Sequence, residues 1–93
     1  MSELQAGVYR HYKGHDYQVF NLVRHSETEQ ALVVYRCLYG DFSWWVRPLD
    51  MFQETVEIDG QTVARFAYVK PFVSDDYPAA PDLSMFNAEG LAG

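Results

Sequence analysis

The chain has 93 residues, of which 16% are aromatic, so its length allows one small domain with a small core. Its formal net charge is −6, yet all seven Lys and Arg residues lie between positions 10 and 70, together with eight acidic residues. The body of the chain is therefore close to neutral. A strong electrostatic field for polyanions is excluded, whereas a local basic patch is not.

One cysteine, Cys37, lies in the most apolar segment of the chain. A disulfide framework cannot form from a single cysteine, so we expect a reducing, cytoplasmic setting. The N-terminus has no basic region followed by an apolar run, and no apolar segment approaches the roughly 18 residues of a membrane span. We therefore expect neither secretion nor contact with a membrane.

Six short segments have the alternation of apolar and polar residues that is typical of strands. In chain order they cover residues 8–13, 16–23, 32–39, 43–47, 53–58 and 62–70. Turns are expected at Gly14 and Gly40, and Asp59-Gly60 is the strongest hairpin signal in the chain. Pro48 is expected to end the fourth segment, because proline lacks the backbone donor that a strand needs.

Residues 32–39 are apolar on both faces, which predicts a strand covered on both sides. Only Arg36 breaks the pattern, and we expect a structural role for it beside a nearby acid, since an unpaired buried charge is costly. After Pro48, residues 49–52 are expected to form one tight turn that places Met51 and Phe52 at an end of the core.

Together these segments predict a mainly β protein, a small antiparallel β-barrel, open or closed, of the SH3-like size with about five to six strands. The expected organisation is a frayed N-terminus at 1–6, the barrel domain at 7–73 and a flexible, acidic tail with Pro and Ala at 74–93. Leu83, Met85 and Phe86 are apolar residues of this tail that could dock on the body.

The body of the chain carries a series of short motifs in this order: Gly7-Val-Tyr-Arg-His-Tyr-Lys-Gly14, Tyr17-Gln-Val19, Arg24-His-Ser-Glu-Thr28, Val33-Val-Tyr35, Leu38-Tyr-Gly40, Trp45-Val-Arg-Pro48, Met51-Phe52 and Arg65-Phe66. In this order the chain resembles a small, mostly bacterial family known as domain of unknown function 1653. The resemblance implies an SH3-type barrel and carries no activity. Ala64 departs from the proline expected before Arg-Phe, which loosens the expected geometry of the last strand.

The candidate ligand-binding surface combines arginines, histidines, an acid and a tyrosine that stand at strand ends and in loops, where binding groups usually lie. Its members are Arg24, His25, Glu27, Tyr35, Arg47 and Arg65, with Arg10 and His11 as additions. Arginine offers a planar fork of donors for carboxylate or phosphate, and aromatic rings offer stacking. A solvated hairpin loop, or ion pairs with Glu27, Glu29, Glu54 or Asp50, would explain the same residues.

Three more specific sites are alternatives to this surface: a hydrolase site, a metal site and an aromatic cage. His25, Ser26 and Glu27 supply the residue types of a hydrolase, but neighbours on an extended chain point apart. His11 and His15, with His25 and an acid, could bind a metal, yet Gly14 between the first two argues against the helix that would bring them together. Trp44, Trp45, Tyr39 and Tyr35 could form an aromatic cage, although alternation sends the two tryptophans to opposite faces.

The resulting hypothesis is a cytoplasmic, non-catalytic binding module for an anionic or nucleotide-like ligand, a nucleic acid or a protein partner, with no cofactor and no metal. A small hydrolase or transferase with His25 as general base, oriented by Glu27 or Glu29, is the first alternative. An accessory or regulatory protein whose partner covers exposed aromatics is the second. The sequence leaves the oligomeric state open.

Overall fold

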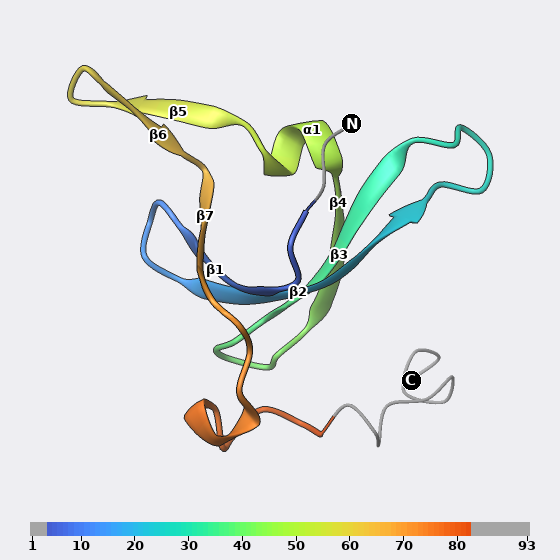
Figure 1. The fold of residues 1–93 in the computed structure, drawn as a ribbon, viewed down its shortest axis with the longest axis vertical. Helices are drawn as coiled ribbons and strands as arrows, with labels where there is room; N and C mark the ends of the chain where they lie inside the picture. The colour runs from blue at the N-terminus through green and yellow to red at the C-terminus, as the bar shows by residue number, and fades with distance from the viewer. Residues whose placement is uncertain (1–3, 83–93) are drawn as a thin grey trace.

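The computed structural model describes residues 4–82 and has a five-stranded antiparallel sheet as its centre (Figure 1). The strand order is β4-β3-β2-β1-β7, formed by β1 (Gly7–His11), β2 (Asp16–Arg24), β3 (Ala31–Cys37), β4 (Trp44–Pro48) and β7 (Phe66–Lys70). A separate hairpin consists of β5 (Thr55–Ile58) and β6 (Gln61–Ala64), and the helical turns are α1 (Leu49–Phe52) and η1 (Ser74–Asp76).

The mainly β fold is confirmed, but the sheet is not closed into a barrel. Strands β4 and β7 are its two edges, because the β5–β6 hairpin leaves the sheet and projects away from it (Figure 1). The single strand expected at residues 62–70 is divided at Arg65. The Arg65 amide donates to the Glu54 carbonyl, and the Arg65 carbonyl accepts from the Tyr12 amide. These two bonds turn the chain from the hairpin into the sheet.

The turn signals of the sequence correspond to real turns. Asp59 and Gly60 have φ values of 52° and 80°, both positive, as the favoured two-residue hairpin turn requires. Gly40 has a φ of 61° in the turn in which the Phe42 amide donates to the Tyr39 carbonyl. The expected tight turn after Pro48 is the single-turn helix α1, which buries Phe52.

The core lies on one face of the sheet, which we call the inner face. Its buried cluster contains Tyr9, Val19, Val33, Tyr35, Phe52 and Phe66. The rings of Phe52 and Phe66 stack with centroids 4.2 Å apart, so α1 and β7 meet over the sheet. Aromatic side chains fill a small core with few positions, which explains their high proportion in this chain.

The opposite face, which we call the outer face, carries a buried charge. Arg36 is 1% exposed, as expected of a structural arginine, and donates to the Gln18 side-chain oxygen and to the Pro81 carbonyl. Residues 74–82, the first part of the predicted tail, therefore lie against this face. The rest of that tail, with Leu83, Met85 and Phe86, falls outside the described residues.

No helix among residues 4–82 is both long enough and apolar enough to cross a membrane.

Candidate functional site

A groove of about 270 Å³ opens on the inner face beside the core. Strands β2, β3 and β4 and the connection after β3 supply its walls. The residues that line it, and that define the inner groove, are Tyr17, Tyr35, Cys37, Tyr39, Trp45 and Arg47. Cross-strand register brings these side chains together, because Tyr17 pairs with Cys37 and Tyr35 pairs with Trp45. Residues that face each other across paired strands project from the same side of a sheet.

Arg47 supplies the positive charge of the groove. Its guanidinium carbon lies 5.5 Å from the centroid of the Phe66 ring, and its Nε donates to the Tyr35 hydroxyl at 3.5 Å. The aromatic face holds the guanidinium by a cation–π contact, while the long hydrogen bond leaves most of the donor fork available. The groove therefore presents an arginine fork that is already positioned.

The rim of the groove is a network of aromatic side chains. The hydroxyls of Tyr17 and Tyr39 are 2.8 Å apart, and this hydrogen bond, with burial, raises the pKa of Tyr39. The His15 ring stacks on Tyr39 with centroids 4.3 Å apart. Contacts on both sides of Tyr39 fix its ring, so this wall is rigid.

Trp45 forms the exposed wall of the groove. It is 55% exposed, although its indole Nε1 donates to the Ser43 hydroxyl at 2.7 Å. The hydrogen bond holds the indole in place while more than half of the residue stays exposed. A fixed aromatic face beside a cation can stack a planar group and bind its negative charge.

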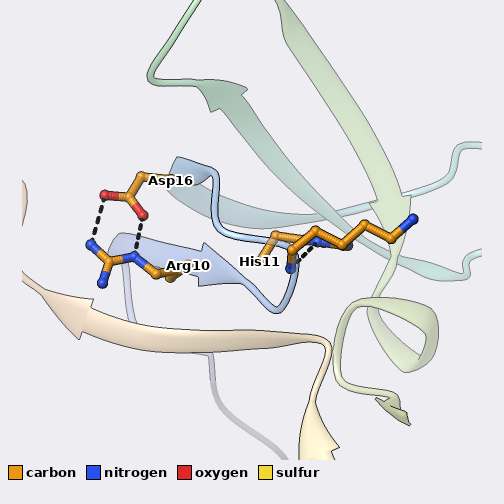
Figure 2. A network of polar contacts seen from close by, with 4 residues as sticks. Arg10, His11 and Asp16 are labelled. Carbon is orange, nitrogen blue, oxygen red and sulfur yellow. Dashed lines mark hydrogen bonds and ion pairs between the residues drawn. The ribbon is translucent and has the colours of Figure 1, made fainter. Parts of the chain in front are cut away.

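His11 lies next to the groove as a neutral imidazole. Its ring packs edge-on against Phe66 at 4.9 Å, and its Nδ1 accepts from the Lys13 amide at 3.1 Å (Figure 2). Burial, followed by the charge of Arg65 and smaller contributions that include Arg47, lowers the pKa of His11. Neutral His11 therefore uses Nδ1 as an acceptor and has its proton on Nε2.

The structure brings four of the eight predicted residues to this region: Tyr35 and Arg47 in the groove, with His11 and Arg65 beside it. Arg65 is tied to Glu54, with its Nη2 3.0 Å from the carboxylate, and its buried Nε has no hydrogen-bond partner within the described chain. Arg10 pairs with Asp16 at 2.7 Å on the outer face, away from the groove (Figure 2).

The other three predicted residues lie at the far end of β2. Arg24 pairs with Glu29 at 3.5 Å, and both side chains are mostly exposed. His25 and Glu27 follow in the β2–β3 connection. Strand β2 has nine residues, and at about 3.3 Å per residue it separates Arg24 from Tyr17 by more than 20 Å. Arg24 is therefore far from Tyr17, and none of these three residues is among those that line the inner groove.

His25 has a local structural role. Its Nδ1 accepts from the amides of Glu27 and Thr28 at 3.1 and 3.3 Å, so the imidazole closes its own loop. Using Nε2 as a general base requires the proton on Nδ1, which would break both bonds. This geometry favours a loop-stabilising function over base catalysis. No group of three or more His, Cys, Asp or Glu among residues 4–82 is arranged to hold a metal.

The sequence did not indicate that Tyr17 and Cys37 line the inner groove, and it placed Trp45 and Tyr39 only in a possible aromatic cage. Alternation is right about the tryptophans, because Trp45 lines the groove and Trp44 stacks on Phe20 on the outer face with centroids 4.2 Å apart. The pairing of Tyr17 with Cys37 depends on strand register, which the sequence does not specify.

Comparison with known proteins gives a family and a fold. Residues 7–68 match the family described as protein of unknown function DUF1653. The crystal structure of a DUF1653 protein from Bordetella bronchiseptica is 38% identical in sequence, with a TM-score of 0.69, and the match covers 76% of this chain and 94% of that one. No curated protein matches the chain.

Proposed function

The chain belongs to the DUF1653 family of proteins of unknown function, and we propose that it is a non-catalytic binding module whose inner groove takes a planar, anionic, nucleotide-like ligand. The observation that carries this proposal is the meeting of the exposed Trp45 ring and the Arg47 fork in one groove. A nucleobase would stack on the ring, and a phosphate would accept from the guanidinium.

The charge of the chain favours a small ligand over a long polyanion. Among the six lining residues, Arg47 carries the positive charge, while His11 and Arg65 lie nearby. The body of the chain is close to neutral and the remaining acidic residues lie toward its ends, so the charge outside the groove does not attract an extended nucleic acid. A mononucleotide, or the end of a single strand, matches this distribution best.

Backbone amide mapping by NMR tests the proposal directly. The labelled chain is titrated with mononucleotides, short single-stranded DNA and RNA, and phosphorylated metabolites. We expect shifts that converge on residues 17, 35, 37, 39, 45 and 47. Shifts confined to Arg24, His25 and Glu27 would move the site to the β2–β3 connection and contradict the groove.

Two substitutions separate stacking from charge recognition. Trp45→Ala and Arg47→Gln should each weaken binding by about fivefold or more, since a stacked base or a charge-assisted hydrogen bond contributes at least about 1 kcal/mol. Val46→Ala, on the opposite face of the same strand, and Arg24→Gln, at an exposed arginine, are the matched controls. Equal losses in the variants and their controls would sink the proposal.

A protein partner is the second candidate, favoured by the exposed edge of the sheet. Trp45 and Val46 on the edge strand β4 are 55% and 58% exposed, and an edge strand can pair with another chain. A folded spectrum that is silent across the ligand panel would favour this candidate.

Cys37 is free and buried, which supports the proposal of a cytoplasmic setting for either function.

A further inference from the structure

The outer face carries a layered stack around the buried Arg36. Its guanidinium carbon lies 5.7 Å from the centroid of the Phe20 ring and 5.6 Å from that of Phe72. Trp44 stacks on Phe20, and the Arg36 Nε donates to Gln18 at 2.8 Å. The face is therefore a forked cation between aromatic rings, which is the kind of surface that binds carbonyl and carboxylate groups.

This surface is covered by residues 74–82, Ser-Asp-Asp-Tyr-Pro-Ala-Ala-Pro-Asp, which we call the strap. Figure 1 shows the strap below the sheet, on the side opposite α1. Arg36 Nη1 donates to the Pro81 carbonyl at 3.0 Å, and the Tyr77 ring stacks on Phe72 with centroids 5.6 Å apart. Two contacts with the face thus anchor the strap, one at each end of a turn.

The strap lies on the outer face without sealing it. Seven of its nine residues are exposed, with Tyr77 and Ala80 half-buried. A cavity of about 320 Å³ remains between the strap and the sheet, lined on the two sides by Arg36 and Phe72 and by strap residues such as Pro78. The ion pair of Lys70 with Asp76, at 3.0 Å, joins two side chains that are each more than 40% exposed, so it holds the strap weakly.

Strands β2, β3 and β4 of the outer face lie within the residues that match the family model, whereas the strap does not. Gln18, Phe20, Arg36 and Trp44 lie within the matched residues 7–68, whereas Phe72 and the whole strap lie beyond them. The Bordetella bronchiseptica structure is matched over 94% of its length by 76% of this chain.

We propose that the outer face is a peptide-docking surface for an extended, acidic, proline-containing segment of another protein, and that the strap occupies it within the chain. The strap shows which chemistry fits: a backbone carbonyl for Arg36, a ring for Phe72, and prolines that reduce the cost of ordering the segment. Asp76 pairs with Lys70 beside this face, and Asp75 and Asp82 are the other acidic residues of the strap.

Occupation by the strap acts as competition. A tethered segment has an effective concentration on the order of millimolar. A partner peptide with the same affinity must therefore be present above that concentration, or bind when the strap is released. The two binding surfaces are then independent, because the inner groove lies on the opposite face of the sheet. Loss of the strap exposes the outer face and leaves the inner groove unchanged.

The test uses a synthetic peptide with the sequence of residues 74–82 and the labelled full-length chain. Tyr77→Ala removes the ring that stacks on Phe72 and so loosens the strap. We expect the peptide to bind this variant at least tenfold more tightly than it binds the unaltered chain, with shifts at residues 18, 20, 36, 44 and 72. A folded Tyr77→Ala chain that shows no shifts at millimolar peptide would overturn the proposal.

A chain ending at Val73 gives a second, independent readout, and it should bind the peptide most tightly. Arg36→Gln in the Tyr77→Ala chain should remove most of that binding, whereas Arg24→Gln, the same charge change at an exposed site, should not. A scrambled peptide of the same composition that bound equally well would overturn the proposed recognition. A concentration-dependent dimer of the Tyr77→Ala chain, abolished by Arg36→Gln, would reassign the surface to the strap of a second copy.

Discussion

Arg36 shows how a single buried charge organises one face of this molecule. Burial lowers the pKa of its guanidinium, yet the group remains charged at any physiological pH because arginine is not deprotonated in proteins. Its cost is offset by the hydrogen bonds to Gln18 and Pro81 and by the rings of Phe20 and Phe72. The residue links the central strand to a segment 45 positions later in the chain.

Replacing this guanidinium should therefore lower stability measurably. Arg36→Gln leaves the buried Gln18 oxygen and the part-buried Pro81 carbonyl without their donor, and we expect the free energy of unfolding to fall by about 1–3 kcal/mol in urea titrations. Arg24→Gln, at an exposed ion pair, should change it by less than about 0.5 kcal/mol. Equal effects of the two substitutions would mean that the outer face is solvated around Arg36.

His11 gives stability a pH dependence whose sign follows from its lowered pKa. Burial and the neighbouring Arg65 disfavour the imidazolium in the folded chain, so the unfolded chain binds the proton more readily. The contribution of His11 is complete above the unfolded pKa of 6.5 and is lost as the pH falls below that value toward the folded pKa. Thermal unfolding should show a smaller decrease in Tm from pH 7.5 to pH 5 for His11→Gln than for the unaltered chain. An identical decrease in both chains would contradict this assignment.

At the scale of single residues, the sequence predicted the candidate site only for residues whose surroundings follow from their place along a strand. Tyr35 and Arg47 lie on one face because Tyr35 pairs with Trp45, and Arg47 follows two residues later on the same face of β4. Arg24 was grouped with them by its residue type, but it pairs locally with Glu29 at the other end of β2. Which strand end a residue occupies depends on hairpin register, and that information is not local to the residue.

At the scale of elements, the start of β1 depends on Gly7. Its φ is +142°, and a Cβ built there would lie 2.8 Å from the Lys70 carbonyl oxygen and 2.9 Å from a ring carbon of Tyr68. The close pairing of β1 with β7 therefore requires a residue without a side chain at this position.

Gly7→Ala should accordingly destabilise the fold more than Gly40→Ala does. Gly40 has a φ of +61° and nothing within 4 Å of an added Cβ, so its replacement costs only the left-handed backbone conformation, about 1 kcal/mol. The Gly7 variant adds two steric conflicts, and we expect a loss of roughly 2–4 kcal/mol. Chemical denaturation of both variants measures the difference, and a smaller loss for Gly7→Ala would show that β7 can shift away from β1.

The strands themselves were predictable because hydrophobic alternation and turn residues are local signals. Asp59-Gly60 predicted its hairpin correctly for this reason. The break at Arg65 was not predictable, because it depends on backbone bonds to Glu54 and Tyr12, which are distant in sequence. Those bonds divide one expected strand into β6 and β7 and direct the hairpin out of the sheet.

At the scale of the whole molecule, the departure of this hairpin explains why the expected barrel stays open. Closure requires the two edge strands to pair, and here β4 and β7 remain at opposite edges of the sheet. Periodicity indicates how many strands exist and which face of each is apolar, but it does not indicate how they are ordered in space. The open sheet leaves its inner face accessible beside the core, and the inner groove lies there.

The distribution of charge over the whole molecule makes a last prediction, which rests on the proposed function. If the inner groove binds the end of a single-stranded oligonucleotide, Arg47 contacts about one phosphate, and the logarithm of the affinity should fall with the logarithm of the salt concentration with a slope near −0.7 to −1.5. Quenching of tryptophan fluorescence at several salt concentrations measures this slope. Arg47→Gln should reduce it by about 0.7, while Arg24→Gln should leave it unchanged. A slope steeper than about −4 would require a track of phosphate contacts along the surface, which a chain with a net charge of −6 and one cation in its groove does not offer. Such a result would therefore place the nucleic acid outside the inner groove and contradict the proposed site.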